Sequence, residues 1–243
     1  MARRSERQER GAGLIVGGTR RVWRFIWRWL RRAMLALALL GALAVVLFAY
    51  VDPPMTLYMA AENARHGGLR HEWVDFEDIA PVMARAVVAA EDANFCAHWG
   101  FDMAAIRQVI AAGQRRGAST ISQQVVKNVY LWPERSWLRK ALEALITPAV
   151  ELVWSKQRIL EVYLNVAEFD TAVFGVEAAA QHHFGVPASA LTAVQASRLA
   201  AVLPDPKGRS ATVATPYLER RAASIRDGAE TIRRDGRAGC FEG

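Results

Sequence analysis

The sequence predicts a mainly α-helical protein with a basic N-terminal tail (1–32), a single transmembrane helix (33–51), a membrane-proximal connector (52–72) and one helical domain (73–243). Three observations support this organisation. Residues 33–51 are apolar and carry no charge, apolar residues in the body recur at helical spacing, and no stretch alternates as a half-buried strand does. A chain of 243 residues suffices for one ordinary domain plus an appendage.

The positive charge of the chain is confined to its first residues. Positions 1–32 hold ten arginines and two glutamates, a formal charge of +8, so the rest of the chain contributes −1 to the total of +7. A nucleic-acid-binding protein would instead carry its basic residues on the folded body. The charge therefore indicates a tail, and we expect no nucleic-acid partner.

The apolar run Ala33 to Val51 is long enough to span a bilayer. As a helix its nineteen residues would extend about 28 Å, close to the ~30 Å hydrocarbon core. Arginines before it and Asp52 after it place the N-terminus in the cytoplasm and the body outside. A cleaved signal peptide is the alternative, but the run is long for one and no small-x-small cleavage site follows. A buried helix of a soluble protein fits the one-sided arginines poorly.

Helix-capping residues predict where the helices of the body begin. Pro81 is expected in the first turn of the helix before Glu91, and Ser119 or Thr120 is expected to cap a helix from Gln123. Pro148 is expected to bend its helix, and Ser155 to cap the helix that follows it. Thr192 and Gln195 form a capping box for a helix that stops at Pro204, and Thr215-Pro216 precedes the last helix. Cys96 and Cys240 allow at most one disulfide and make no metal site, and whether they pair stays open. His182 and His183 are expected to be surface residues.

Two adjacent acids, Glu91 and Asp92, follow the apolar helix "PVMARAVVAA". The C-terminus of a helix carries partial negative charge, which disfavours an ionised carboxylate there. A carboxylate in this position would have raised proton affinity, which suits a general base for a sugar hydroxyl. The alternative is a pair of solvated acids at the start of a loop.

The segment "GASTISQQVVKN" begins the next helix with polar residues. Gly117 frees the backbone, and N–H groups at the helix start can bind an anion. Helical spacing places four polar side chains on one face, namely Gln123, Gln124, Lys127 and Asn128. A cation one turn from an anion-binding helix start indicates a phosphate ligand, although the spacing is not that of a P-loop. A solvated polar face is the alternative.

The segment "ERSWLRKALEAL" adds three cations and a carboxylate, Arg135, Arg139, Lys140 and Glu143. Arg139 and Glu143 are four residues apart and could form an ordinary surface ion pair. Alternatively, the cations face a diphosphate and Glu143 is the second carboxylate of a glycosyl-transfer site.

Together these segments resemble the peptidoglycan glycosyltransferases, specifically the monofunctional membrane-anchored polymerases of Gram-negative bacteria. The resemblance runs from about Trp73 to about Pro206. Its four motifs are E-D-x-x-F-x-x-H-x-G at Glu91, Asp92, Phe95, His98 and Gly100; G-G-S-T-[IL]-[ST]-Q-Q-x-x-K-N at Gly117, Ser119, Thr120, Ile121, Ser122, Gln123, Gln124, Lys127 and Asn128; R-K-x-x-E at Arg139, Lys140 and Glu143; and R-I-L-E-x-Y-L-N at Arg158 to Asn165. Ala118, Asp170 and Asp205 depart from the family pattern, and none of them is a proposed catalytic group.

The resemblance implies a lysozyme-like helical lobe beside a smaller lobe apposed to the bacterial inner membrane, and a moenomycin-sensitive enzyme that polymerises lipid II into glycan strands. Glu91 would be the base, and Glu143 would assist on the donor side directly or through a divalent cation (Mg²⁺ or Mn²⁺). The diphosphate would be held by Lys127, Arg135, Arg139 and Lys140, with Ser119, Gln124 and Asn128 as polar contacts. Other cell-wall synthesis or division proteins are expected partners.

Neither S-x-x-K nor K-T-G occurs, so we expect no transpeptidase activity. Two other functions compete with polymerisation. A lytic transglycosylase would need no cationic diphosphate clamp, and a non-enzymatic scaffold would not need both glutamates.

Overall fold

The structure is a computed structural model that describes residues 2–113 and 119–242, with only the backbone described for residues 2–20. The chain divides after Leu47 into a helical N-terminal unit and a body that begins at Phe48. Gly117 and Ala118, which the sequence singles out, lie outside the described residues.

The N-terminal unit consists of helix α1, Ala2–Phe48. Its segment Arg21–Phe48 is long and apolar enough to cross a membrane. At 1.5 Å per residue this segment measures about 42 Å, more than the hydrocarbon core requires. The sequence placed the tail (1–32) and the span (33–51) in separate segments, whereas both belong to one helix that ends at Phe48, before Val51.

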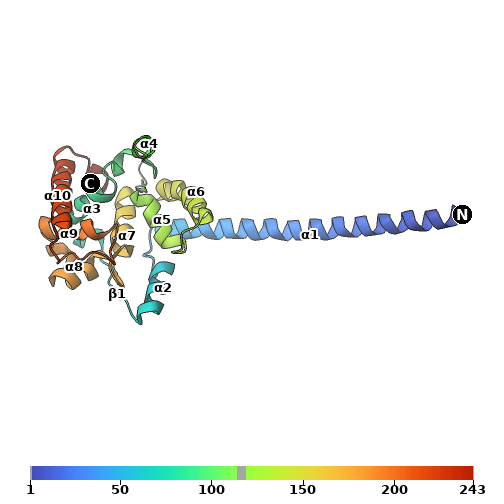
Figure 1. Cartoon of the computed structure of the whole chain (residues 1–243), viewed down its shortest axis with the longest axis horizontal. Helices are drawn as coiled ribbons and strands as arrows, with labels where there is room; N and C mark the ends of the chain where they lie inside the picture. Colours follow the sequence, from blue (N-terminus) through green and yellow to red (C-terminus); the bar gives the residue numbers. More distant parts are fainter. Residues whose placement is uncertain (1, 114–118, 243) are drawn as a thin grey trace. The chain divides into compact units, whose positions relative to one another are not determined.

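The body is built around two groups of helices (Figure 1). In one group α3 (Pro81–Glu91), α9 (Ala193–Val202) and α10 (Pro216–Arg234) pack on one another. In the other, α5 (Ile121–Tyr130) packs on α6 (Trp137–Val153) and α7 (Lys156–Val166). The remaining helices are α2 (Leu57–His66), α4 (Met103–Ala111), α8 (Val176–Phe184) and α11 (Gly239–Glu242), with 3₁₀ turns η1 (Phe76–Asp78), η2 (Phe95–Ala97) and η3 (Ala188–Ala190). The mainly helical prediction is confirmed.

The capping residues predicted most helix starts correctly. Thr120 forms a capping box with Gln123, so α5 begins at Ile121 rather than at Gln123. The side chains of Ser155, Thr192 and Thr215 cap α7, α9 and α10, and Pro81 is in the first turn of α3. Helix α6 continues through Pro148, the expected bend, to Val153. Helix α9 ends at Val202, and α10 is not the last helix because α11 follows.

Three short strands, which the sequence analysis did not predict, form a small sheet in the order β1-β3-β2. Strand β1 (Arg70–His71) pairs in parallel with β3 (Val173–Phe174), and β2 (Glu168–Asp170) pairs antiparallel with β3. Strands of two or three residues are too short to show an alternating pattern. The segment 52–72, expected to be a connector, instead contributes α2 and β1 to the body.

The two cysteines form a disulfide that joins Cys96 in η2 to Cys240 in α11. It links positions that are 144 residues apart. Phe241, beside Cys240, is buried and its ring lies 6.4 Å from the ring of Phe95. Helix α11 is thereby fixed against the loop that follows α3.

Candidate active site

Glu91 is the last residue of α3 and makes specific side-chain contacts. Its Oε2 accepts a hydrogen bond from Nε2 of Gln124 over 2.9 Å. The hydroxyl of Tyr163 donates to Oε1 of Gln124 over 3.4 Å. Nη2 of Arg221, on α10, lies 3.8 Å from Oε1 of Glu91. The Glu91 side chain is 14% exposed, so it can be reached from solvent without being a freely solvated acid.

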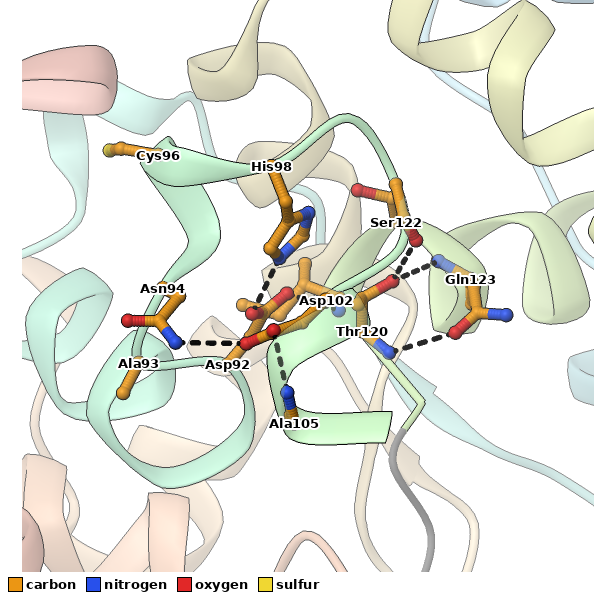
Figure 2. Close-up of polar contacts among 12 residues, drawn as sticks. Asp92, Ala93, Asn94, Cys96, His98, Asp102, Ala105, Thr120, Ser122 and Gln123 are labelled. Carbon is orange, nitrogen blue, oxygen red and sulfur yellow. Dashed lines mark hydrogen bonds and ion pairs between the residues drawn. The ribbon is translucent and has the colours of Figure 1, made fainter. Parts of the chain in front are cut away.

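Asp92, the neighbouring acid, has a structural role. Its Oδ1 contacts Nε2 of His98 over 2.8 Å, and its Oδ2 accepts from the backbone N–H of Ile121 over 3.0 Å (Figure 2 shows the Asp92–His98 contact). Asp102 likewise accepts from Nδ2 of Asn94 and from the backbone N–H of Ala105 (Figure 2). The Asp92 side chain is 2% exposed whereas that of Glu91 is 14% exposed, so Glu91 is the more accessible of the two acids.

The start of α5 differs from the anion site that the sequence predicted. The N–H of Ile121 is paired with Asp92. The N–H of Gln123 is paired with Oγ1 of Thr120 (Figure 2). Two of the N–H groups at this terminus are therefore already satisfied by side chains and are not free to bind an anion.

The four polar residues of α5 have different surroundings. Gln123 is buried and serves the capping box. Gln124 contacts Glu91, and Asn128, one turn further along α5, is buried. Lys127 is partly buried, and burial lowers its pKa, as do the positive charges of Arg139 and Lys140; the charges of Glu143 and Glu91 act in the opposite direction. Lys127 thus interacts electrostatically with both proposed catalytic carboxylates.

The residues of α6 form a second charged cluster. Nη1 of Arg139 lies 3.2 Å from Oε2 of Glu143, and Nζ of Lys140 pairs with the other carboxylate oxygen. Lys140 also donates to Oγ of Ser119 over 3.3 Å. The side chains of Glu143 and Arg139 are 3% and 10% exposed, so their pair is buried and is not the surface pair that i,i+4 spacing usually gives, whereas Lys140 is 43% exposed. Arg135, before the start of α6, is exposed.

The surroundings of Glu143 do not fit the divalent cation that the family resemblance suggested. One carboxylate oxygen faces the guanidinium of Arg139 and the other faces the ammonium of Lys140. A metal ion at this carboxylate would meet two positive charges at close range. We therefore assign no step to a metal at Glu143.

A network of buried polar contacts supports the loop after Glu91. Nζ of Lys156 contacts Oε1 of Glu151 and the backbone oxygen of His98, each over 2.8 Å, and lies 4.4 Å from the centre of the Phe95 ring. The same Glu151 oxygen accepts from Oγ of Ser122. These contacts join α5, α6 and α7 behind the site and restrict the position of the loop.

Gly100 lies in the same loop at φ 81°, in the left-handed region. Its carbonyl accepts from Oγ1 of Thr120 over 2.7 Å. A Cβ atom at this position would lie 2.5 Å from Cγ2 of Thr147, so both the conformation and the space require glycine.

Sequence reasoning missed four contributors to the site: Arg221, Tyr163, Glu151 and Lys156. Tyr163 is part of the R-I-L-E-x-Y-L-N motif, which could have indicated its role. Arg221 has no such signal, because α10 lies beyond the matched motifs and reaches Glu91 only through the packing of α10 on α3.

The histidine pair of α8 also differs from expectation. The sequence placed His182 and His183 on the surface. His182 is exposed, but the side chain of His183 is 3% exposed, and both rings face the carboxylate of Asp170.

Comparison with known proteins agrees with the motifs. The transglycosylase family matches residues 60–230. The biosynthetic peptidoglycan transglycosylase of Jannaschia sp. (strain CCS1) is 58% identical over 240 residues, covering 99% of this chain and 98% of the relative. The proteins of that name from Escherichia coli O127:H6 and Caulobacter vibrioides are 47% and 43% identical, over 84% and 89% of this chain and 89% and 98% of their own lengths. The chain therefore belongs to the transglycosylase family, among the biosynthetic peptidoglycan transglycosylases.

Proposed function

We propose that this enzyme polymerises lipid II, an undecaprenyl-diphosphate disaccharide-pentapeptide, by inverting glycosyl transfer. Glu91 removes the proton from the 4-hydroxyl of the acceptor GlcNAc. The oxygen attacks C1 of the growing chain and forms a β-1,4 bond. The bond from C1 to the α-linked diphosphate breaks, and its electron pair leaves with undecaprenyl diphosphate.

One observation carries this proposal: the segment 119–124 connects the two carboxylates. Gln124 hydrogen-bonds to Glu91, and Ser119 accepts a hydrogen bond from Lys140, which pairs with Glu143. A leaving diphosphate develops negative charge, and fixed cations stabilise such charge best in a partly desolvated site. The proposed diphosphate ligands are Lys127, Arg135, Arg139 and Lys140, with Ser119, Gln124 and Asn128 as polar contacts.

Glu143 positions two of these cations. Its carboxylate is paired with Arg139 and Lys140, which are thereby held in place before the substrate binds. A donor diphosphate that enters the cluster meets cations that are already in position, so little reorganisation is required. This role for Glu143 needs no metal.

The substrate's lipid tail requires the enzyme to act at a membrane surface. The apolar segment of α1 is compatible with a single-pass anchor, and we place its N-terminus in the cytoplasm and the body on the periplasmic face of the inner membrane. Helix α6 also exposes large apolar side chains, with Trp137 92%, Leu145 73% and Leu152 74% exposed. A patch of this kind suits contact with lipid. Other cell-wall synthesis or division proteins remain proposed partners, and no transpeptidase activity is proposed.

The test is polymerisation of fluorescent lipid II by the full-length chain in detergent. Wild type is expected to form glycan strands, moenomycin is expected to block them, and Glu91→Gln is expected to reduce the rate by about 10²- to 10⁴-fold with an unchanged melting temperature. Glu219→Gln, an exposed glutamate in the first turn of α10, is the matched control and should retain the wild-type rate.

Two results would overturn the proposal. One is a Glu91→Gln rate within about three-fold of wild type, which would exclude Glu91 as the base. The other is cleavage of preformed glycan by a wild-type protein that leaves lipid II unused, which would indicate a lytic enzyme.

A further inference from the structure

Asp170, His182 and His183 lie together at one edge of the small sheet, and none of them is among the residues assigned to glycosyl transfer. Asp170 ends β2, and the two histidines are in the last turn of α8. Each side chain offers one ligand atom, and the three atoms lie within 4.8 Å of one another. Oδ2 of Asp170 is 3.5 Å from Nε2 of His182 and 3.6 Å from Nε2 of His183.

Nε2 of His183 is buried, and it has no hydrogen-bond partner among the described residues. A buried ring nitrogen without a hydrogen-bond partner requires an explanation. This nitrogen faces Oδ2 of the Asp170 carboxylate across 3.6 Å, an arrangement that a cation between the two atoms would satisfy.

The Asp170 carboxylate is already oriented for such a cation. Its Oδ1 accepts from the backbone N–H of Thr171 over 2.7 Å, so Oδ2 is the oxygen turned toward the histidines. Ala172, which follows Thr171, has φ 56°, in the left-handed region, and its carbonyl accepts from the N–H of Arg70 over 2.8 Å. The hairpin that presents Asp170 is thus fixed by a hydrogen bond within the turn and by one from β1.

We propose that Asp170, His182 and His183 form a Zn²⁺ site that ties β2 to α8. Tetrahedral Zn²⁺ with nitrogen and oxygen ligands at about 2.0–2.1 Å separates adjacent ligand atoms by about 3.4 Å, close to the 3.5 and 3.6 Å between Oδ2 of Asp170 and the two histidine nitrogens. Two imidazoles and one carboxylate are a donor set that Zn²⁺ accepts, and water would complete the coordination. The site is separate from the glycosyl-transfer residues and does not depend on the proposed function.

Arg70 competes with the metal for His182. Its Nη1 donates to Nδ1 of His182 over 2.9 Å, which places the His182 proton on Nε2. Zn²⁺ on Nε2 would require the proton to move to Nδ1 and the guanidinium to swing away. Arg70 is exposed and can do so, and a shallow pocket lined by Arg70, Thr171 and His182 adjoins the site.

The test is Zn²⁺ titration of the full-length chain in detergent, after treatment with EDTA and removal of any histidine tag. Isothermal titration calorimetry should give one Zn²⁺ per chain, and Co²⁺ should produce visible absorption bands. Asp170→Asn retains the shape of the side chain and the bond from Thr171, yet should weaken binding at least about ten-fold. His182→Ala should act similarly, whereas Arg70→Ala should strengthen binding several-fold because it removes the competing cation.

His66→Ala is the control, since this histidine lines the adjoining pocket and pairs with Glu62 but is not one of the three proposed ligands. It should bind Zn²⁺ as wild type does. Zn²⁺ should also raise the melting temperature of wild type and of His66→Ala but not that of Asp170→Asn. The proposal is overturned if wild type shows no saturable binding, if Asp170→Asn binds as tightly as wild type, or if His66→Ala loses binding to the same extent.

Discussion

Gln124 donates a hydrogen bond from Nε2 to Oε2 of Glu91 over 2.9 Å, and this contact joins the end of α3 to the first turns of α5. The hydroxyl of Tyr163, a fully buried residue of α7, donates a hydrogen bond to Oε1 of the same Gln124 side chain. The orientation of the proposed base is therefore fixed by two helices that follow it in the sequence.

Replacing Gln124 by alanine should slow polymerisation without unfolding the protein. Loss of a hydrogen bond to a charged group costs about 1.5–3 kcal/mol, which corresponds to a fall of roughly 10- to 100-fold in kcat if the bond positions Glu91 for proton transfer. Gln181→Ala is the matched control, because Gln181 makes an exposed hydrogen bond to Glu177 on α8. Equal rates for the two variants in a lipid II assay would contradict the positioning role.

Lys127 should determine how activity declines at high pH. Burial and the charge of Arg139 lower the pKa of Lys127, so it loses its proton at a lower pH than an exposed lysine does. If the charged form binds diphosphate, kcat/KM should fall as pH rises through that lowered pKa, because the kcat/KM profile reports the free enzyme. Lys127→Arg retains a charge at alkaline pH.

The measurement for Lys127 is the pH profile of kcat/KM between neutral and alkaline pH. In Lys127→Arg the alkaline decline should move to higher pH even if the maximum rate falls. Lys140→Arg changes a more exposed lysine of the same cluster and serves as control. A decline that stays in place in Lys127→Arg would show that another group controls it.

Gly100 should be intolerant of alanine for two separable reasons. The left-handed conformation at φ 81° costs roughly 1–2 kcal/mol for a residue with a Cβ, and contact at 2.5 Å with Cγ2 of Thr147 should add about 1–3 kcal/mol. Gly185→Ala isolates the first cost, since Gly185 has φ 65° and a Cβ there would meet no atom of the described residues within 4 Å.

Denaturant unfolding of Gly100→Ala and Gly185→Ala measures the difference. Adding Thr147→Ser to Gly100→Ala deletes the clashing methyl group and keeps a hydroxyl able to donate to the Glu143 carbonyl. The double variant should recover the steric part of the loss. If it recovers nothing, the clash is not the cause.

Removal of the disulfide should destabilise the body. Cys240→Ser opens a link between residues 144 positions apart, and loss of a native disulfide typically costs 2–5 kcal/mol. Thermal unfolding with and without reducing agent measures the effect. Reduction should lower the melting temperature of wild type and leave that of Cys96→Ser/Cys240→Ser unchanged, whereas equal responses would show that the link contributes nothing.

Local signals in the sequence predicted most of the helical framework. Capping depends on neighbouring residues, so Thr120 with Gln123 and Thr192 with Gln195 mark α5 and α9 before any packing is known. The small sheet could not be found in this way, because β1 and β3 pair across about a hundred residues and are each two residues long. Their partners are specified by tertiary packing alone.

The candidate site, like the fold, was predictable only where local motifs mark it. The motifs identified Glu91 and Lys127. They do not reveal that Asp92 contacts His98 and the N–H of Ile121 at the start of α5. Nor could spacing show that Arg221 reaches Glu91, since that contact depends on how α10 packs against α3. The pairing of Cys96 with Cys240 is likewise a consequence of where α11 lies.

The disulfide has a consequence for biosynthesis. Its second cysteine lies in α11, and Glu242 of the same helix forms an ion pair with Arg85 of α3 over 2.6 Å. Each of the four motifs precedes α11 in the sequence, so the helix that carries Glu91 gains these restraints only after α11 has been synthesised. A chain truncated before α11 would contain every residue proposed for chemistry and yet be sensitive to proteolysis around η2. The folding of the helix that carries the proposed base is thereby linked to the presence of α11 and to an oxidising compartment.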